Sequence, residues 1–237
     1  SFGARTVDVD ALVDEMNWAT ARWLSPSGYE AAVMAGERRP PIDTAIVARA
    51  LDAYRTVKHD RGVVDLDDLL GLTVDAIERD HSFADSMRWR FRHVLVDEAQ
   101  DLNPLQHRLI DALRAGRDDV YLVGDPAQAI YGFNGSDPAL LVEVADRFPG
   151  VEIIRLPSTH RSTAQVLEAR AHALRNDDQT ADIESVRGDG AIVQIVEFAD
   201  EDAEAAGIAR SIRVVDPSLV RRNQVAILAR TNAQLPP

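Results

Sequence analysis

The sequence predicts an α/β fold in which a helical N-terminal segment precedes a parallel β-sheet with helices between its strands. Apolar residues recur at helical spacing through about the first 90 residues, where no convincing strand pattern occurs. From residue 91 onward, short apolar runs alternate with helical patterns. Polar residues follow two of these runs directly, as they do at the carboxyl ends of buried parallel strands. These observations indicate strand–helix–strand units after a helical start.

The N-terminal helices are predicted from apolar spacing and from the residues at their ends. Residues 7–24 and 42–58 carry apolar side chains at three- and four-residue spacing, and segments rich in Pro, Ser and Gly separate them. A further helix begins at Asp65, because acidic residues suit the positive end of a helix dipole. Its inward face is expected to consist of Leu66, Leu69, Leu70 and Val74.

A βαβ unit is predicted around two apolar runs. Residues 93–96 and 119–123 have the pattern of buried parallel strands, and polar residues follow each of them. Between them, Asn103 and Pro104 provide a helix cap and a first-turn proline, and Gly116 ends that helix. Beyond this unit the pattern predicts two helices near 163–175 and 200–215, and three strands at residues 151–156, 191–198 and 224–229.

Composition limits the functions that the chain can have. Its 237 residues include 39 acidic and 26 basic ones, for a net charge of −13, and every basic residue except Lys58 is arginine. Lys58 lies in no GxxxxGK[ST] pattern, so the sequence contains no phosphate-binding loop of that type. The absence of cysteine excludes disulfides, thiolate metal sites and a cysteine nucleophile, and favours a cytoplasmic location. No apolar run approaches the roughly 18 residues that cross a bilayer, so no membrane contact is expected.

Three carboxylates follow the first strand of the βαβ unit. Asp97, Glu98 and Asp101 lie within five residues of one another. One carboxylate at a strand end can hold Mg²⁺ against nucleotide phosphates, and a neighbouring one can orient and deprotonate an attacking water. A strand followed by acidic helix-capping residues gives the same pattern without catalysis. Both interpretations are open at this point.

A loop with an amide and two aromatic rings follows the second strand. Gln128, Tyr131 and Phe133 lie in a segment that also contains glycine and proline. An amide can contact both a phosphate oxygen and a bound water, and exposed rings can stack on nucleic-acid bases. The alternative is that both rings belong to the core, as lone aromatic residues usually do.

These segments resemble a known family when they are taken together. Residues 97–106 and 124–133 are similar to motifs II and III of the UvrD/Rep/PcrA group of superfamily 1 DNA helicases. Residues 61–70 are similar to the family motif that precedes the Walker B strand, and 156–163 and 225–234 are similar to motifs IV and IVa. Five motifs in the family's order form a far more specific signal than any one of them alone.

The resemblance implies roles in ATP hydrolysis for five residues. Asp97 would hold Mg²⁺, and Glu98 would activate the hydrolytic water. Gln128 would sense the γ-phosphate of ATP and couple it to DNA, and Arg161 would act as an arginine finger from a second motor domain. His160 stands where the family usually has a tyrosine against the adenine, and an imidazole can also stack there.

The resemblance also implies a DNA-binding groove. Phe133 stands where a tryptophan normally stacks on a DNA base, and Asn134 stands where arginine is usual. These departures preserve a stacking ring but put the contact of that arginine in doubt. Tyr131, Arg230 and Asn232 would lie near the bound strand.

A domain layout follows from the same resemblance. Residues 1–64 would form a helical segment of the insertion in the first motor domain, and 65–149 the C-terminal half of that RecA-like domain. Residues 150–237 would begin the second motor domain. The expected fold therefore comprises parts of two RecA-like parallel-sheet motor domains of the P-loop NTPase type with an N-terminal helical insertion. The chain would be an internal portion of a longer protein whose phosphate-binding loop precedes Ser1.

The implied function is that of an ATP-dependent DNA helicase. The parent protein would couple Mg²⁺-ATP hydrolysis to 3′ to 5′ movement on single-stranded and tailed duplex DNA, in DNA repair or replication. The acidic net charge does not exclude this, because a groove that stacks bases needs only local positive charge. One alternative is a non-catalytic DNA- or protein-binding module that keeps the motor fold without its phosphate loop. Another is a metal-dependent nuclease built on Asp97, Glu98 and Asp101.

Overall fold

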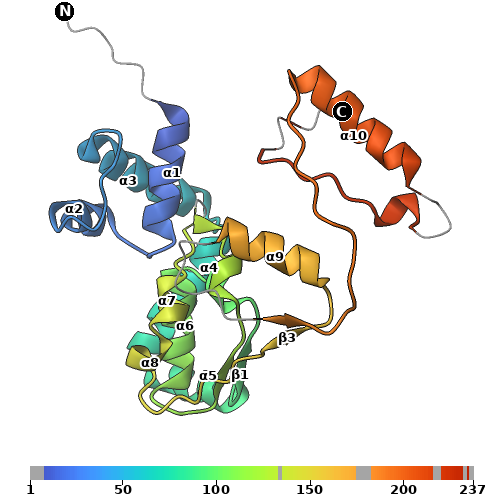
Figure 1. The fold of residues 1–237 in the computed structure, drawn as a ribbon. Coiled ribbons are helices and arrows are strands. Elements are labelled where there is room, and N and C mark those ends of the chain that lie inside the picture. The colour runs from blue at the N-terminus through green and yellow to red at the C-terminus, as the bar shows by residue number, and fades with distance from the viewer. Residues whose placement is uncertain (1–7, 133–134, 175–182, 216–219, 232–233, 235–237) are drawn as a thin grey trace, which may run out of the picture. The chain divides into compact units, whose positions relative to one another are not determined.

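The computed structural model describes residues 8–132, 135–174, 183–215, 220–231 and 234. Phe133, Asn134 and Asn232, which were expected to contact DNA, lie outside the described residues. The chain divides into two compact units, the first of residues 1–157 with 174–182 and the second of residues 158–173 with 183–237 (Figure 1). Among the described helices, none is both long and apolar enough to cross a membrane.

Five helices open the described part of the first unit (Figure 1). Three of them correspond to the predicted helices at residues 7–24, at residues 42–58 and from Asp65 onward. The helices Pro26–Met34 and His81–Arg90 are additional to those predictions. Each of the five begins at a side chain that caps its first turn, and the cap of α4 is a reciprocal pair in which Asp65 and Asp68 each accept the other's backbone N–H. The expected helix start at Asp65 is thus confirmed. The five helices are α1 (Val9–Thr20), α2 (Pro26–Met34), α3 (Thr44–Arg61), α4 (Leu66–Arg79) and α5 (His81–Arg90).

The predicted βαβ unit is confirmed. Strand β1 (Val94–Val96) pairs in parallel with β2 (Val120–Leu122), and α6 (Pro104–Arg114) connects them. Asn103 caps α6 through its side chain, and Pro104 occupies the first turn. The short helices η1 (Ala99–Asp101), η2 (Pro126–Gln128), α7 (Ala139–Val142) and α8 (Val144–Arg147) complete this part.

The two strands of this sheet are less buried than their sequence predicts. The register places Leu95 opposite Tyr121, and these side chains are 74% and 59% exposed. The expectation that both strands are buried is therefore wrong for Leu95 and Tyr121, because the described residues leave one face of the sheet open. A shallow hollow of about 430 Å³ lies there.

The first unit has its apolar core among the N-terminal helices. Ala19, Tyr29, Val47 and Leu51 form this core, with partly buried neighbours on α1, α2 and the segment before α3. Helix α4 packs against both α5 and α6, and its side chains at Val74 and Ile77 are almost completely buried. The helical segment and the βαβ unit therefore each contribute buried apolar surface to one unit. The inward face expected for α4 is wrong in part, because Leu66 and Leu69 are 81% and 55% exposed.

The described residues of the second unit form two α-helices, a short parallel pair of strands and a short 3-10 helix. Helices α9 (Ala164–Ala173) and α10 (Glu201–Val214) confirm the helices expected near 163–175 and 200–215. Strand β3 (Ser158–Thr159) pairs with β4 (Glu184–Ser185), and the short helix η4 (Arg222–Gln224) lies near the C-terminus.

Three predicted strands are absent from the described structure. Residues 151–156, 191–198 and 224–229 form no strand, although their sequences are rich in β-branched residues. Ile154, Ile195 and Leu228 are 68%, 97% and 91% exposed. An apolar, β-branched segment becomes a strand only where a neighbouring strand provides backbone hydrogen bonds. No such neighbouring strand lies beside these three segments among the described residues.

Candidate functional site

The candidate site lies where β1 and β2 end. Backbone hydrogen bonds continue past the strands, because Val123 N donates to Val96 O (2.8 Å) and Ala99 N donates to Val123 O (2.8 Å). The segment that begins at Asp97 therefore runs beside the segment that begins at Gly124. The polar residues that follow the two strands therefore lie on adjacent backbone segments, as is usual at the carboxyl ends of parallel strands.

Asp97 and Glu98 present two exposed carboxylates at the end of β1. Asp97 Oδ1 accepts the backbone N–H of Glu98 (3.0 Å). Glu98 adopts a left-handed backbone conformation with φ 51° and ψ 43°, which is uncommon for a residue other than glycine. Such conformations are concentrated at functional sites, because the surrounding structure must hold them. An exposed carboxylate at this position has the donor chemistry that Mg²⁺ prefers.

Gln128 belongs to a turn that an aspartate holds together. Asp125 Oδ1 accepts the N–H of Ala127 (3.0 Å), and its Oδ2 accepts the side-chain Nε2 of Gln128 (2.8 Å). Sequence reasoning gave Asp125 no role. The Asp125-Pro126 pair could have indicated this turn, because aspartate at the start of a tight turn commonly accepts backbone N–H groups.

Gln100 connects the two strand ends, and sequence reasoning assigned it no role. Its side-chain Nε2 donates to Glu98 Oε2 (2.8 Å), and its Oε1 accepts the backbone N–H of Asp125 (3.0 Å). The residue is only 1% exposed. Glu98 and Gln128 are therefore joined by a continuous series of hydrogen bonds through Gln100 and Asp125.

Asp101 does not join Asp97 and Glu98 in a three-carboxylate cluster. It lies in η1, and its Oδ1 is buried without a hydrogen-bond partner. Over the described part of the chain, no three Asp, Glu, His or Cys side chains are grouped as metal ligands. The geometry thus gives no support to the nuclease interpretation, whereas a magnesium ion held by one carboxylate, water and phosphate needs no such cluster.

The remaining expected site residues within the described part of the chain are exposed. Tyr131 follows η2 in the first unit and is 44% exposed. His160, Arg161 and Arg230 lie in the second unit with exposed side chains. The backbone N–H of Arg161 donates to Thr159 Oγ1 (3.3 Å), and its carbonyl accepts Nη1 of Arg187 (3.0 Å). The expected contacts of Arg161 and His160 with ATP, and of Tyr131 and Arg230 with DNA, stay predictions.

Lys58 is paired with two aspartates where α3 ends and α4 begins. Its Nζ lies 2.7 Å from Asp65 Oδ2 and 2.7 Å from Asp68 Oδ1, so it joins the end of α3 to the start of α4. Burial lowers the pKa of Lys58, but the hydrogen bonds to the two carboxylates outweigh this effect and raise it overall. Lys58 is thus committed to a helix junction, in agreement with its lack of a phosphate-loop context.

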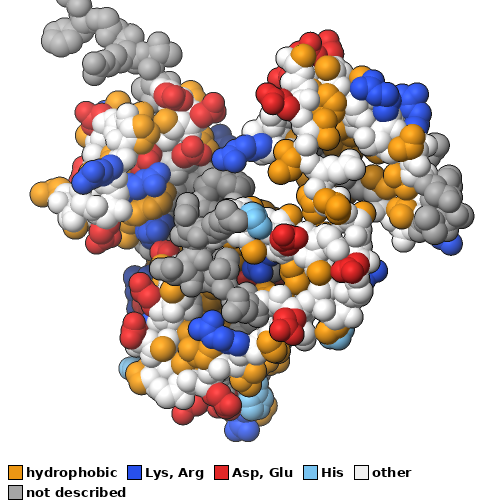
Figure 2. All heavy atoms as spheres, in the orientation of Figure 1, with side chains coloured by type: hydrophobic (Ala, Val, Ile, Leu, Met, Phe, Trp, Pro, Cys, Tyr) orange, Lys and Arg blue, Asp and Glu red, His pale blue; other side chains and the backbone are white. Residues whose placement is uncertain are grey.

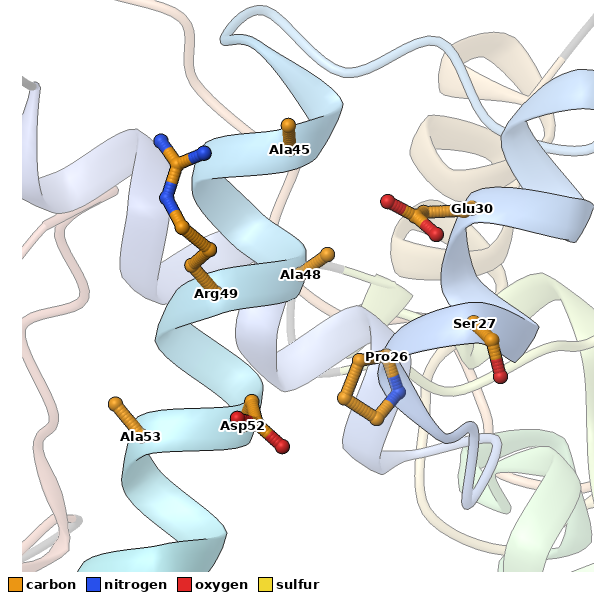
Figure 3. Close-up of a pocket in the computed structure, with 8 residues that line it drawn as sticks. All are labelled: Pro26, Ser27, Glu30, Ala45, Ala48, Arg49, Asp52 and Ala53. Atoms are coloured by element: carbon orange, nitrogen blue, oxygen red, sulfur yellow. The ribbon is translucent and has the colours of Figure 1, made fainter.

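A hollow of about 750 Å³ between α2 and α3 contains none of the expected site residues (Figure 3). Glu30 and Arg49 border it, together with Pro26, Ser27, Ala45, Ala48, Asp52 and Ala53. On the face shown in Figure 2, acidic and basic side chains of the described residues are interspersed.

The sequence matches the family model of the UvrD/REP helicase N-terminal domain over residues 14–149. It is 38% identical over 240 residues to the ATP-dependent DNA helicase UvrD2 of Mycobacterium tuberculosis, with 98% of this chain and 34% of the relative covered. It is 28% identical over 191 residues to the ATP-dependent DNA helicase PcrA of Staphylococcus aureus, covering 80% of this chain and 26% of the relative.

A third relative is the putative ATP-dependent DNA helicase YjcD of Bacillus subtilis, which is 23% identical over 246 residues. That alignment covers 92% of this chain and 32% of the relative. The chain thus spans about a third or less of the length of these curated relatives. The match to the family model extends over more than half of the chain, from the N-terminal helices through the candidate site. The chain belongs to the UvrD/REP helicase family.

Proposed function

We propose that this chain is the portion of an ATP-dependent DNA helicase that carries the groups for hydrolysis and coupling. The observation that carries the proposal is the hydrogen-bonded connection between Glu98 and Gln128 at adjacent ends of two parallel strands. A general base acts on the water that attacks the γ-phosphate, and a phosphate-sensing amide contacts the same γ-phosphate. The two side chains must therefore be held at a fixed distance and orientation from each other. The names of the relatives, all ATP-dependent DNA helicases, support the same function.

In this proposal Asp97 holds Mg²⁺, which would neutralise the charge that develops on the phosphates. Glu98 accepts a proton from the attacking water, and Gln128 contacts the γ-phosphate. Arg161 acts as an arginine finger and His160 stacks on the adenine, both from a second RecA-like domain that begins near residue 150. Tyr131, Phe133, Asn134, Arg230 and Asn232 border the groove for the DNA strand.

The proposed parent protein moves 3′ to 5′ along single-stranded DNA in the cytoplasm, acts on tailed duplexes and serves DNA repair or replication. Residues 1–64 are its helical insertion segment and 65–149 the rest of its first motor domain. Residues 1–237 alone are expected to hydrolyse no ATP, because Lys58 belongs to a helix junction and no phosphate-binding loop occurs in them. DNA-stimulated phosphate release by the purified 237 residues would contradict this expectation.

The decisive experiment is Glu98→Gln in the full-length protein. Loss of the carboxylate removes the general base but keeps the side-chain shape, so hydrolysis should fall by about 10²-fold or more, with nucleotide binding retained. Phosphate release in the presence of single-stranded DNA and binding of a fluorescent ATP analogue measure the two quantities. Glu30→Gln is the matched control, because Glu30 is exposed on α2 beside an unrelated hollow. Normal turnover by Glu98→Gln would overturn the proposed role.

A further inference from the structure

The side chain of Gln100 is held at both ends inside the protein. It belongs to η1 and is only 1% exposed, so its amide has lost almost all contact with water. Its Oε1 accepts the backbone N–H of Asp125 (3.0 Å), and its Nε2 donates to Glu98 Oε2 (2.8 Å). A buried amide with both ends bonded has little freedom to rotate or shift.

The chemistry of these partners fixes the orientation of the amide. A backbone N–H can only donate, so the oxygen of Gln100 must face Asp125. The nitrogen must then face Glu98, whose carboxylate can accept. The orientation follows from the partners and needs no assumption about which amide atom is which. Gln100 therefore supplies a donor to the carboxylate that is proposed to act as general base.

This donor matters because little else in the described residues restrains the carboxylate of Glu98. Glu98 is exposed, and its left-handed backbone turns it out of line with β1. A side chain in such a position can adopt several rotamers in water. The bond from buried Gln100 selects the rotamer in which Glu98 Oε2 lies 2.8 Å from the amide nitrogen.

The other end of Gln100 fixes the turn that carries Gln128. The N–H that it accepts belongs to Asp125, the residue whose carboxylate holds Ala127 and the side chain of Gln128. Space for the amide exists because residue 124 is glycine. A Cβ built on Gly124 would lie 2.6 Å from Gln100 Oε1 and 2.8 Å from Leu141 Cδ2, closer than real contacts allow.

From this geometry we propose that Gln100 is a positioning residue that sets the orientation of Glu98 and holds it in register with the turn carrying Gln128. The inference rests on the proposed function, in which Glu98 activates water and Gln128 contacts the γ-phosphate. Gln100 itself would touch neither ATP nor DNA. Its effect should therefore fall on the rate of the chemical step rather than on nucleotide affinity.

The test uses three variants of the full-length protein. Gln100→Glu has nearly the same shape and keeps an acceptor for Asp125 N–H, but it replaces the donor to Glu98 by a second carboxylate. Gln100→Met has a similar length and removes both bonds. Gln106→Glu makes the same charge change six residues further along the chain. The side chain of Gln106 accepts the N–H of Asn103 in the capping box of α6, and a glutamate can accept the same N–H.

We expect Gln100→Glu to lower the kcat of DNA-stimulated ATP hydrolysis by about tenfold to hundredfold, the range for a hydrogen bond to a charged group. The KM for ATP should stay within about threefold of the wild-type value, and Gln106→Glu should match the wild type in both. A kcat for Gln100→Glu within about twofold of the wild type, or an equal loss in Gln106→Glu, would overturn the inference. So would a change confined to KM.

Amide hydrogen exchange separates this inference from the proposed function. Peptides that cover residues 122–130 should exchange faster in Gln100→Met, because the N–H of Asp125 has lost its acceptor, and at the wild-type rate in Gln106→Glu. A wild-type protein that hydrolyses no ATP would refute the proposed function, and the exchange data would still decide whether Gln100 fixes the turn. Unchanged exchange in Gln100→Met would refute that part of the inference.

Discussion

Gly71 lies directly beneath the indole ring of Trp23, so that a Cβ built on Gly71 would lie 2.2 Å from Cδ2 of that ring. The ring is held in place, because Nε1 of Trp23 donates to Asp75 Oδ2 (3.2 Å) one turn further along α4. Trp23 itself has a left-handed backbone with φ 55°. Close approach of the ring to the helix therefore requires glycine at position 71.

Gly71→Ala should destabilise the protein, although alanine is the better helix former by about 1 kcal/mol. Overpacking against a fixed ring is expected to cost about 1–3 kcal/mol, which exceeds the gain in helix propensity. Urea unfolding measures the difference. In a Trp23→Ala background the clash is gone, and the same substitution should become neutral or stabilising. A stabilising Gly71→Ala in the wild-type background would contradict the observed packing.

Lys58→Met should lower the free energy of unfolding by about 1–3 kcal/mol, because Asp65 and Asp68 would face each other without a cation. The side chains of Lys58, Asp65 and Asp68 are only partly exposed, so water screens the repulsion between the two carboxylates incompletely. Lys58→Arg keeps a positive charge at the α3–α4 junction and is the matched control. Equal stability of the methionine and arginine variants in urea unfolding would show that the charge is unimportant.

Arg38→Ala should destabilise the helical segment by about 3 kcal/mol, the usual result of leaving a buried charge without its partner. Glu15 is 0% exposed. Its carboxylate accepts a bifurcated hydrogen bond from Arg38 Nε, one hydrogen bond from Arg38 Nη2 and one from the hydroxyl of Tyr29. The neighbouring Arg39 is exposed and provides the control. The expectation fails if Arg39→Ala costs as much as Arg38→Ala in thermal or urea unfolding.

His107 should make the protein less stable as the pH falls below about 6.5. Burial lowers its pKa to about 4, with a further lowering by Arg147 that Asp111 and Asp137 oppose. Neither ring nitrogen has a hydrogen-bond partner. Between about pH 6.5 and 4 the unfolded chain binds this proton and the folded chain does not, so stability rises with pH by up to about 1.4 kcal/mol per unit.

His107→Leu tests this dependence, because it removes the titrating group from the same buried position. Urea unfolding at pH 7 and pH 5 should show a smaller loss of stability on acidification in the variant than in the wild type. Above about pH 6.5 both states carry a neutral imidazole, and the group should contribute no slope there. Parallel pH profiles of the two proteins would exclude His107 as the source of the dependence.

The sequence predicts most reliably those elements whose ends are set by residues close together in the chain. Asn103 and Pro104 begin α6 and Asp65 begins α4, because a helix cap depends on side chains only a few positions away in the sequence. The apolar runs of β1 and β2 form strands because they pair with each other. The strand predicted at residues 191–198 is wrong because a strand also needs a paired neighbour, which its own sequence does not encode.

The candidate site was predictable only in part, for a similar reason. Asp97, Glu98 and Gln128 could be selected because their chemistry is visible in the sequence next to a strand end. The bond from Gln100 to Asp125 spans 25 positions and depends on the parallel pairing of β1 with β2. The same holds for Trp23 and Gly71, whose contact depends on how α4 packs.

The crowding between Gly124 and Gln100 has an evolutionary consequence. A side chain at position 124 and a full-length amide at position 100 compete for one volume, because a Cβ on Gly124 would lie 2.6 Å from Gln100 Oε1. Selection should therefore act on the two positions jointly. Because a Cβ on Gly124 would also lie 2.8 Å from Leu141 Cδ2, descendants that replace the glycine are expected to carry a shorter residue at position 100 and a changed residue at position 141. Replacement of the glycine alone should be deleterious.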